Sequence, residues 1–539
     1  MFLVGGAHVA PLFFQHHRIN HYYSKVEQNY ICIMSHVDFQ KIISHCKEYG
    51  FIFPSSEIYD NLGAVYDYGP FGVELKNHIK EYWWKSMVQM HENIVGIDAA
   101  IFMHPTTWKA SGHVDSFQDP LIDNKDSKKR YRADVLIEEK IEKLKDKGLK
   151  ELTKKGFDFS KTEEEKALAS RDYKKSLELE EKYIIAANAG DLTQYKALIE
   201  EYDIVCEVSG TKNWTDVRQF NLMFGTKLGA LDEASTDLYL RPETAQGIFV
   251  NFLNVQKTAR MKLPFGIAQI GKAFRNEIVA RQFIFRMREF EQMEMQFFIQ
   301  PGTQKEWFEY WKKARMKWHL ALGTIPDELR FHVHEKLAHY ADAAEDIQFK
   351  FPIGYKELEG IHSRTDFDLG NHQQFSGKKM QYFDPERNES YVPYVVETSI
   401  GLDRMFLRLI SENLKEEQLD NDKRMVLALP PALAPIKVAV LPLLKKDGLP
   451  EKAREIMETL KFVGRTYYEE KDTIGKRYRR MDAIGTPFCI TIDHQTMEDN
   501  TVTIRDRDTM SQQRIAVDSL SQLITEKVDM NTLLKKAMA

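Results

Sequence analysis

The chain has 539 residues, too many for one hydrophobic core, so we predict two or three domains. Hydrophobic residues make up 43% and charged residues 29%, as in ordinary globular proteins, and no apolar run reaches the ~20 residues of a membrane helix. The formal net charge of −5 excludes a strong overall basic field, although local Lys and Arg patches are enough to bind RNA.

Four cysteines are spread along the chain: Cys32, Cys46, Cys206 and Cys489. None forms a CxxC pair, which predicts neither a zinc site nor a disulfide framework. Thiols of this kind fit a reducing compartment, so we expect a cytoplasmic protein.

Residues 1–33 hold the apolar run PLFF followed by His16, His17 and Arg18, and no acidic residue precedes Glu27. A secretory signal needs a longer apolar stretch and a small-residue cleavage site, and a transit peptide is richer in Arg and Ser. We therefore expect an extension without function before a working start near Met34. A transit segment is the alternative.

From residue 34 to 136 the pattern predicts two helices and a strand. Apolar residues recur at helical spacing from Val37 to Cys46, and a second helix is predicted over 73–90. The run GIDAAIFMHP then predicts a strand over 96–105, closed by Pro105 because proline cannot donate into a sheet ladder.

The composition changes abruptly between residues 137 and 201. Lys and Glu dominate there, with Leu and Ile every three to five positions. This pattern predicts an inserted helical hairpin or small subdomain whose charges form a solvated helix face.

From Tyr202 to Ile410 the chain is rich in short β-type runs, and FEQMEMQFFI shows strict alternation. Strands joined directly by short loops predict an antiparallel sheet. Three prolines in 426–435 indicate a connection between domains. Strand, helix and strand patterns then predict a compact α/β domain over 436–539.

Three familiar motifs are excluded as false leads. Gly266 to Lys272 fits GxxxxGK, but Ala273 replaces the required Ser or Thr and the run continues as strand. In HVHEKLAH the histidines His334 and His339 are five apart, unlike the four of HExxH, so we interpret them as surface residues. No GxGxxG follows a strand, which leaves a dinucleotide fold unsupported.

Charged and aromatic residues cluster on two predicted neighbouring strands. Alternation places Arg275 and Glu277 on one face of the first, and Phe290, Gln292 and Glu294 on one face of the second. A guanidinium suits phosphate, an aromatic face suits a purine, and carboxylates suit an ammonium or Mg²⁺. An ordinary sheet face with alternating ion pairs is the alternative.

A second candidate stretch runs from Glu397 to Arg404, ETSIGLDR, before an amphipathic helix. Small residues let the backbone approach a ligand closely. Taken alone, a strand-to-helix turn with a surface arginine explains it equally well.

Together these stretches resemble the three signature motifs of class II aminoacyl-tRNA synthetases. The helix over 73–90 with the strand ending at Pro105 resembles motif 1, the dimer-interface element. FRNE, its loop and the later REF resemble motif 2, and SIGLDRMFLRL resembles motif 3. The third match departs from the family at Asp403, where Glu is commoner, and at Ser399, where many members have glycine.

Finer matches resemble the homodimeric glycyl branch of this class. They are FIFPSSEIY, GAVYDYGPFGVELKN, ASGHVDSFQDPL, RADVLIE, LRPETAQGIFVNF, KELEGI and VVETSIGLDR. They extend from about residue 38 to 410, and the last domain resembles the family's anticodon-binding domain.

The resemblance implies an α+β fold, with an antiparallel catalytic core flanked by helices and a C-terminal α/β anticodon-binding domain. Residues 34–136 and 202–425 would form the core, 137–201 an insertion, 426–435 a linker and 436–539 the last domain. It also implies a homodimer that attaches glycine to tRNA(Gly) through glycyl-adenylate, with ATP and Mg²⁺ and without zinc.

Site residues follow from the same resemblance. Arg275 and Arg404 would be catalytic, on the α- and γ-phosphates of ATP, with Phe290 stacked on adenine and Glu357 a candidate Mg²⁺ ligand. The implied ATP-binding set is Arg275, Asn276, Glu277, Phe285, Arg286, Met287, Arg288, Glu289, Phe290, Glu357, Leu358, Gly401, Leu402, Asp403 and Arg404. The implied glycine-binding set is Arg132, Glu243, Phe290, Glu291, Gln292, Met293, Glu294, Glu397, Thr398, Ser399, Ile400 and Gly401.

For tRNA, a basic cluster stands beside Tyr478 and could contact phosphates, with a solvated loop as the alternative. Its members are Lys476, Arg477, Arg479 and Arg480. A synthetase for threonine, proline or histidine is a rival, against which RPETAQG and ETSIG argue. A non-catalytic nucleic-acid-binding relative is another, and it would be expected to lack Arg275, Glu277 and Arg404.

Overall fold

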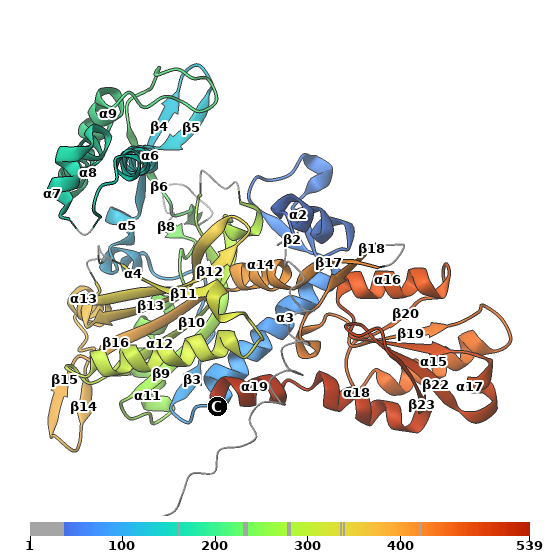
Figure 1. Cartoon of the computed structure of the whole chain (residues 1–539). Helices are drawn as coiled ribbons and strands as arrows, with labels where there is room; N and C mark the ends of the chain where they lie inside the picture. Colours follow the sequence, from blue (N-terminus) through green and yellow to red (C-terminus); the bar gives the residue numbers. More distant parts are fainter. Residues whose placement is uncertain are drawn as a thin grey trace, which may run out of the picture.

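The computed structural model describes residues 37–539 except 160, 230–235, 278–281, 335–336, 338–339 and 420–422. The expectations for residues 1–33 and for His339 lie outside these residues. Figure 1 shows three parts: a central body around a large sheet, a helical lobe at the upper left, and a second α/β unit at the right. Among the described residues, none of the helices has the length and apolar character needed to cross a bilayer.

A seven-stranded sheet forms the central body, in the order β11-β12-β13-β16-β10-β9-β3. Its pairs are antiparallel apart from β3 with β9, which confirms the antiparallel core predicted from the sequence. The strands are β3 Ile94–Gly96, β9 Phe265–Phe274, β10 Glu289–Ile299, β11 Leu329–Val333, β12 Ala343–Phe351, β13 Gly354–Thr365 and β16 Tyr394–Gly401.

Helices α3, α12 and α14 pack against the main core of this sheet. They span Pro70–Trp84, Gln304–Leu320 and Leu402–Asn413, and α2 (Phe39–Glu48) lies nearby. Proline at the first position of α3 suits a helix start, because its missing N–H would have no intrahelical partner there.

The helix predicted over 73–90 is present but is divided differently. After α3 a π-helical turn covers Lys85–Gln89. Leu75, Ile79, Trp83 and Met87 are buried as expected, whereas Val73 and Met90 are exposed. The apolar stripe is therefore narrower than the sequence pattern suggested.

The strand predicted over 96–105 is wrong. Only Ile94–Gly96 pairs in the sheet, and Pro105 begins α4 (Pro105–Ala110). The side chain of His104 accepts a hydrogen bond from the Thr106 N–H and caps that helix. Proline here marks a helix start, which is its other common position.

A smaller apolar cluster covers one end of the opposite face of the sheet. Helices α10 (Ala245–Val250), α11 (Phe252–Thr258) and α13 (Phe367–Ser376) enclose it. The rest of that face holds the polar side chains described below. Smaller elements complete the body: α5 His113–Ser116, β1 Ile52–Pro54, β2 Tyr66–Tyr68, β7 Gly225–Leu228, β8 Thr236–Tyr239, β14 Tyr382–Asp384, β15 Glu389–Tyr391, β17 Leu414–Gln418 and β18 Lys423–Leu427.

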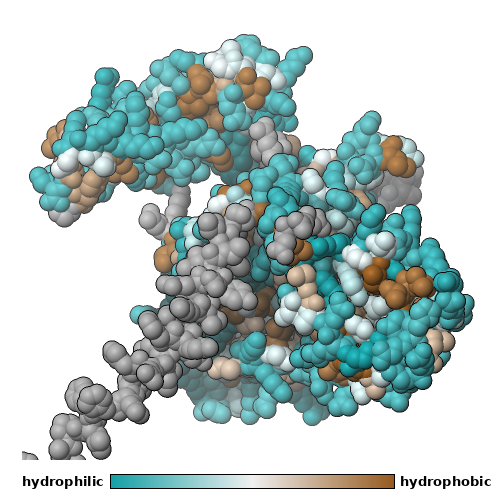
Figure 2. Space-filling view, turned by 45° about the vertical axis from the view of Figure 1, so that its right-hand side comes forward, coloured by the Kyte–Doolittle hydropathy of each residue, from teal (hydrophilic) through white to brown (hydrophobic). Residues whose placement is uncertain are grey.

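The charged segment forms a lobe with its own hydrophobic core, which extends from Ile122 to Val217. Figure 2 shows this lobe projecting from the body, with a largely hydrophilic surface. The helical prediction over 137–201 is met, and a three-stranded sheet joins the helices, in the order β5-β4-β6. The elements are β4 Gln118–Asn124, β5 Lys129–Arg132, α6 Ala133–Lys154, α7 Glu163–Ala169, α8 Arg171–Ala189, α9 Leu192–Glu201 and β6 Arg218–Asn221.

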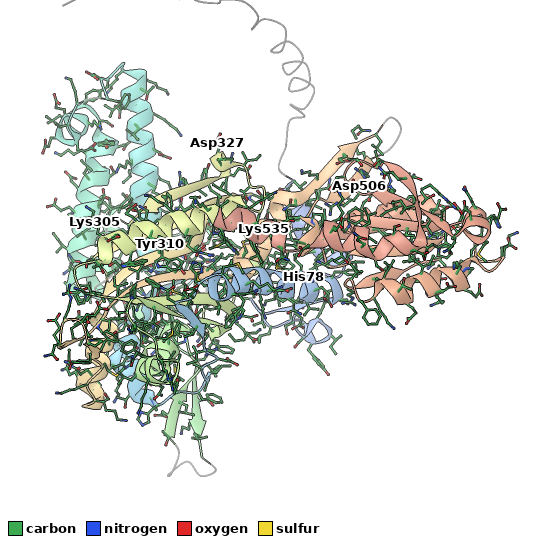
Figure 3. The ribbon with its side chains drawn as sticks, turned by 90° about the horizontal axis from the view of Figure 1, so that it is seen from below. His78, Lys305, Tyr310, Asp327, Asp506 and Lys535 are labelled. Atoms are coloured by element: carbon green, nitrogen blue, oxygen red, sulfur yellow. The ribbon has the colours of Figure 1, made fainter. Side chains whose placement is uncertain are left out.

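The C-terminal unit is a five-stranded mixed sheet in the order β20-β19-β21-β22-β23 with helices around it. Its last helix, α19, leaves this unit and packs on α12 of the central body, and Figure 3 shows Lys535 of α19 near that helix. The elements are β19 Val438–Pro442, α15 Leu449–Leu460, β20 Thr466–Tyr468, α16 Ile474–Ile484, β21 Phe488–Ile492, α17 His494–Asp499, β22 Thr501–Asp506, β23 Gln512–Ala516, α18 Leu520–Val528 and α19 Asn531–Met538.

Candidate active site

Arg275 and Phe290 lie on the same side of the sheet, as their alternation predicts. Ala273 pairs with Phe290 in the β9–β10 register, and the Arg275 N–H donates to the Arg288 carbonyl at 2.8 Å. The Arg275 guanidinium lies over the Phe290 ring, 5.2 Å from its centroid. Its Nε also donates to the carbonyl of Pro242 at 3.0 Å, which fixes its direction.

Arg404 faces Arg275 across a hollow of about 220 Å³, which we call the arginine cavity. It stands in the first turn of α14. Its Nη1 lies 3.0 Å from Glu357 Oε1, and its guanidinium packs over the Phe285 ring at 4.5 Å. The lining residues are Arg275, Glu277, Ile284, Phe285, Arg286, Met287, Phe290, Gln292, Glu357, Ser399, Gly401, Asp403 and Arg404.

Glu357 reaches this cavity because of an irregularity in β13. The β12–β13 register shifts between Ile347 and Gln348, so that Leu358 is an extra residue in the ladder. Glu357 then faces the cavity, where Arg404 lowers the pKa of its carboxyl. The Leu358 side chain belongs to the hydrophobic core and does not line the cavity, so only its backbone is left for the predicted contact with a ligand.

Four other predicted ATP-binding residues do not line the arginine cavity. Arg288 donates to the carbonyls of Glu277 and Gly63, and Glu289 pairs with Lys272 at 2.7 Å. Leu402 is fully buried in the core. Asn276 stands outside the lining too, and its N–H donates to the Leu222 carbonyl.

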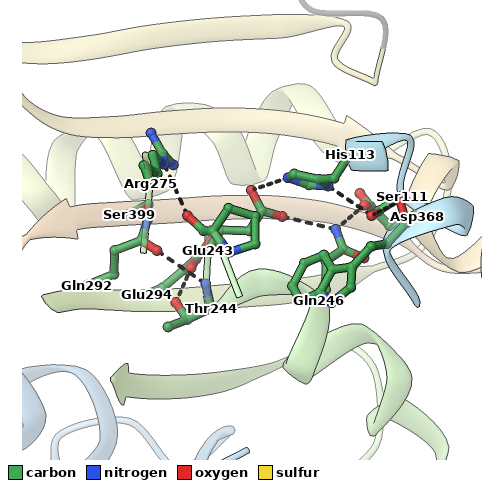
Figure 4. Close-up of polar contacts among 12 residues, drawn as sticks. Ser111, His113, Glu243, Thr244, Gln246, Arg275, Gln292, Glu294, Asp368 and Ser399 are labelled. Atoms are coloured by element: carbon green, nitrogen blue, oxygen red, sulfur yellow. Dashed lines mark hydrogen bonds and ion pairs between the residues drawn. The ribbon is translucent and has the colours of Figure 1, made fainter. Parts of the chain in front are cut away.

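Three glutamates gather on the same face, and we call this group the glutamate pocket. Glu243 and Glu294 are labelled in Figure 4, and Glu397 follows from the β10–β16 register, in which it pairs with Gln296. Glu294 accepts a hydrogen bond from the Thr244 hydroxyl and one from Gln296 Nε2 at 2.9 Å. Gln296 Nε2 also donates to Glu397 at 2.6 Å and so links two of the carboxyls.

Gln292 and Ser399 link the arginine cavity to the glutamate pocket. The Thr244 N–H donates to Gln292 Oε1 at 3.2 Å, and Gln292 Nε2 lies 3.5 Å from the Ser399 hydroxyl. Both residues also line the arginine cavity. A ligand that spans the two hollows would therefore pass over these two side chains.

The three carboxyls differ in how readily they lose a proton. Burial opposes ionisation of Glu243, but His113 and Arg364 outweigh it and lower its pKa to about 2. Burial opposes ionisation of Glu397 too, yet Arg364 and His362 hold its pKa well below the usual range of a carboxyl. Burial and the charges of Glu397 and Glu243 raise the pKa of Glu294 well above its usual value. Ionisation is therefore favoured at Glu243 and Glu397 and disfavoured at Glu294.

A second layer of side chains holds these carboxyls in place. Arg364 donates to Glu397 at 2.9 Å and to Asp368 at 2.8 Å, while His362 Nδ1 lies 2.8 Å from Glu397. Gln246 Nε2 donates to Glu243 at 3.0 Å and to Asp368 at 2.9 Å. Sequence reasoning missed these residues, although alternation along KELEGIHSR would have placed His362 and Arg364 on one face.

Four predicted glycine-binding residues face the other side of the sheet. Glu291 pairs with Lys76 at 3.1 Å and Lys80 at 2.5 Å. Met293 and Ile400 belong to the hydrophobic core, and Thr398 alternates with them. Alternation forbids five consecutive residues from sharing a pocket. The predicted set contains two continuous runs, and the side chain of every second member of each run faces away from the glutamate pocket.

Arg132 and Asp403 have structural partners. Arg132 pairs with Asp119 at 3.1 Å and Asp134 at 2.6 Å within the insertion, and its described contacts do not include the three glutamates. Asp403 accepts hydrogen bonds from Tyr68 and from Lys76. Its carboxylate therefore joins α14 to α3 at the edge of the cavity.

The predicted tRNA-binding cluster lies on α16 and is divided. Lys476 is exposed, whereas Arg477 is only 2% exposed and donates to the carbonyls of Pro442, Glu469 and Leu443. Arg480 pairs with Asp472 at 2.8 Å. Arg477 is therefore a structural residue of this domain, and its predicted contact with phosphate is wrong.

Comparison with known proteins identifies the three parts separately. The family "Glycyl-tRNA synthetase insertion domain 1" matches residues 119–222, and "tRNA synthetase class II core domain (G, H, P, S and T)" matches 224–413. "Anticodon binding domain" matches 437–527. The structure is also similar to Giardia lamblia prolyl-tRNA synthetase in complex with prolyl-adenylate, with a TM-score of 0.55, 16% identity, and coverage of 93% of this chain and 81% of that one.

Curated relatives match over nearly the whole chain. Glycine–tRNA ligase of Chlorobaculum tepidum is 52% identical over 90% of this chain and 99% of its own length. That of Treponema denticola is 48% identical over 91% and 97%, and that of Staphylococcus haemolyticus 48% over 91% and 99%. These matches favour the glycyl branch over its rivals, and the chain belongs to the glycine–tRNA ligase family of class II aminoacyl-tRNA synthetases.

Proposed function

We propose that the chain activates glycine with ATP and transfers it to tRNA(Gly). In the first step the glycine carboxylate attacks the α-phosphorus and pyrophosphate leaves. In the second, a terminal ribose hydroxyl of the tRNA attacks the activated carbonyl and AMP leaves. One observation carries the proposal: the arginine cavity and the glutamate pocket adjoin on one sheet face, with Gln292 and Ser399 between them.

The arginine cavity is suited to ATP. We assign the α-phosphate to Arg275 and the γ-phosphate to Arg404, which would stabilise the charge that develops during the displacement. Phe290 offers a ring for adenine, and Arg275 is already held against it. Arg275 and Arg404 reach the cavity from separate elements, so the substrate would be held between them.

Magnesium would enter with ATP as part of the substrate. Glu357 fits it, since its carboxylate faces the cavity and is half exposed, and Mg²⁺ is usually held by one or two carboxylates together with phosphate oxygens. The ion would supply additional positive charge to the phosphates. The chain's own contribution there is to position Glu357 through the register shift in β13.

The glutamate pocket is suited to the ammonium group of glycine. The lowered pKa values of Glu243 and Glu397 favour the carboxylates that would receive it, while the raised pKa of Glu294 limits the negative charge of the pocket. Every competing amino acid is larger than glycine, so close walls can reject even an added methyl group by steric clash. No editing domain is required on this reasoning.

Three further proposals concern assembly, tRNA and location. The β1–β2 loop exposes Ile58 and Tyr59 by 86% and 80%, as a surface that a second copy would cover in a homodimer. The C-terminal unit, with exposed Lys476, would contact the tRNA. The described cysteines are free thiols, which fits a cytoplasmic location.

Amino-acid-dependent exchange of pyrophosphate into ATP tests the activity. Glycine should support exchange, and alanine, threonine, proline and histidine should not. Arg275→Ala should reduce glycine-dependent exchange by 100-fold or more, the order expected when one preorganised charge is lost, without a change in circular dichroism. Lys305→Ala, on the exposed side of α12, is the matched control and should keep full activity. A wild-type protein that binds tRNA but supports no exchange would establish the non-catalytic alternative.

A further inference from the structure

Three potential metal-binding side chains meet on the sheet face beside the glutamate pocket. They are His334, just after β11, Asp346 on β12 and His362 on β13. Their candidate ligand atoms all lie within 4.8 Å of one another. The sequence interpretation of His334 as a surface histidine is therefore incomplete, because its partners come from neighbouring strands.

Sheet register produces this group. The His334 N–H donates to the Ala344 carbonyl at 3.1 Å, and Ala344 pairs with His362 on the other side. Both histidines thus flank Ala344, and Asp346 follows two residues later on the same face. Rigid paired strands, rather than one flexible loop, hold two of the three ligands.

A missing side chain leaves room between them. Asp346 pairs with Gly360, and a Cβ at Gly360 would lie 3.2 Å from His362 Nε2 and 3.7 Å from Asp346 Oδ1. Any other residue would thus place an atom close to both of these potential ligand atoms. His334 Nε2 is shielded from solvent and makes no regular hydrogen bond among those described, although Asp346 Oδ2 lies 2.8 Å away.

The orientation of His362 is already fixed. Its Nδ1 lies 2.8 Å from Glu397 Oε1, which leaves Nε2 as the ring nitrogen on the side of His334 and Asp346. Metal-binding histidines commonly use this arrangement, in which the second ring nitrogen donates to a carboxylate that sets the tautomer. Here that carboxylate belongs to the glutamate pocket.

We propose that His334, Asp346 and His362 bind one divalent transition-metal ion of the zinc type. Two imidazoles and a carboxylate favour such ions over Mg²⁺, and three protein ligands leave the fourth position open to water. Bonds of about 2.0–2.1 Å require ligand atoms roughly 3.3 Å apart, so the group closes modestly around the ion. This proposal departs from the expectation of a protein without zinc.

The ion would also steady the glutamate pocket. With its Nε2 on the metal, His362 keeps Nδ1–H directed at Glu397 and so holds that carboxylate in place. We expect metal removal to raise the KM for glycine severalfold and leave the KM for ATP unchanged. This consequence depends on the proposed function, whereas metal binding itself does not.

Cobalt titration of the full-length protein tests the site. After treatment with a chelator and dialysis, Co²⁺ should bind one ion per chain, give the visible bands of a low-coordinate cobalt site, and be displaced by Zn²⁺ but not by millimolar Mg²⁺. His334→Ala should weaken binding by about 100-fold, since loss of an outer-shell partner alone costs 10–100-fold. His332→Ala is the matched control: His332 lies on β11, two residues before His334, with its ring 5.9 Å from that of His334, and outside the metal group.

Two outcomes would overturn the proposal: no stoichiometric Co²⁺ binding by the folded wild type, or equal affinity in His334→Ala. His334 and Asp346 would then be an ordinary ion pair. Exchange assays with metal-loaded and metal-free protein keep the two proposals apart. If neither the metal-loaded nor the metal-free protein supports glycine-dependent exchange, the proposed function is contradicted. If the protein supports normal exchange but binds no metal, only the metal site is contradicted.

Discussion

Replacing Glu294 by glutamine tests the charge distribution of the glutamate pocket. Glu294 is 2% exposed, and its pKa is raised by burial and by Glu397 and Glu243. An amide offers one acceptor and donor N–H groups, much as a protonated carboxyl does. Glu294→Gln should therefore keep the KM for glycine within about threefold of wild type, because the net charge of the pocket at pH 7 does not change.

Glu397→Gln is the contrasting variant. It removes an ionised group that Arg364 and His362 face, and hydrogen bonds to charged groups contribute about 1.5–3 kcal/mol. With 1.4 kcal/mol per tenfold, the KM for glycine should rise by roughly 10- to 150-fold. Glycine titrations of the exchange rate measure both variants.

Stability gives an independent readout of Glu294. In the unfolded chain its carboxyl ionises above about pH 4.5, while in the folded protein the raised pKa keeps the proton. Folding then takes up a proton, so the wild type loses stability as pH rises from about 4.5 toward the folded pKa. At pH 7, about 2.5 pH units above the pKa of the unfolded chain, the loss is at most about 3 to 4 kcal/mol, at 1.36 kcal/mol per pH unit.

Glu294→Gln lacks this proton uptake, so its thermal midpoint should exceed that of the wild type at pH 7.5, and the difference should vanish below pH 4.5. Thermal scans across this range make the measurement. If the variant loses glycine affinity as Glu397→Gln does, and gains no stability at pH 7.5, Glu294 is ionised and the reasoning fails.

Arg404→Ala should raise the KM for ATP at least tenfold in pyrophosphate exchange, because the guanidinium lies in the arginine cavity. The KM for glycine should stay within twofold of wild type. Equal effects on the two KM values would contradict the assignment of ATP and glycine to separate sites. Arg477→Ala should lower the thermal midpoint, since three carbonyls lose their donor, and the buried one, that of Pro442, loses it at a cost of about 1–3 kcal/mol. Lys476→Ala should leave the midpoint unchanged and raise only the KM for tRNA, and the reverse pattern in this pair would refute both roles. Gly72→Ala should destabilise the protein strongly in thermal unfolding, because its Cβ would lie 2.0 Å from the Phe51 carbonyl oxygen; an unchanged midpoint would show that α3 shifts freely.

Alternation along single strands was enough to predict the centre of the site. The period of two in FEQMEMQFFI places Phe290, Gln292 and Glu294 together, and the β9–β10 register then brings Arg275 to the same side. The antiparallel core and the separate charged lobe followed from patterns of similar strength. Local periodicity therefore carried the prediction wherever a residue's face depends on its own strand.

Features that depend on other strands were out of reach. One extra residue, Leu358, reverses the alternation of β13 and turns Glu357 to the cavity, and no local signal marks that position. His334 and His362 are 28 positions apart and meet only through the register of three strands. Arg477 looked like a phosphate contact until its neighbours showed that the carbonyls of its own domain occupy it.

The return of α19 to the central body has a mechanical consequence. The C-terminal unit is attached at its start by the connection near Leu433, which accepts a hydrogen bond from His78 of α3, and at its end by α19 against α12. A domain attached at one point can rotate relative to its neighbour, whereas attachment at both ends restricts such rotation. Two attachments restrict changes in the separation between α16 and Arg275, so an elongated nucleic acid that contacts both would be selected by its length as well as by its bases.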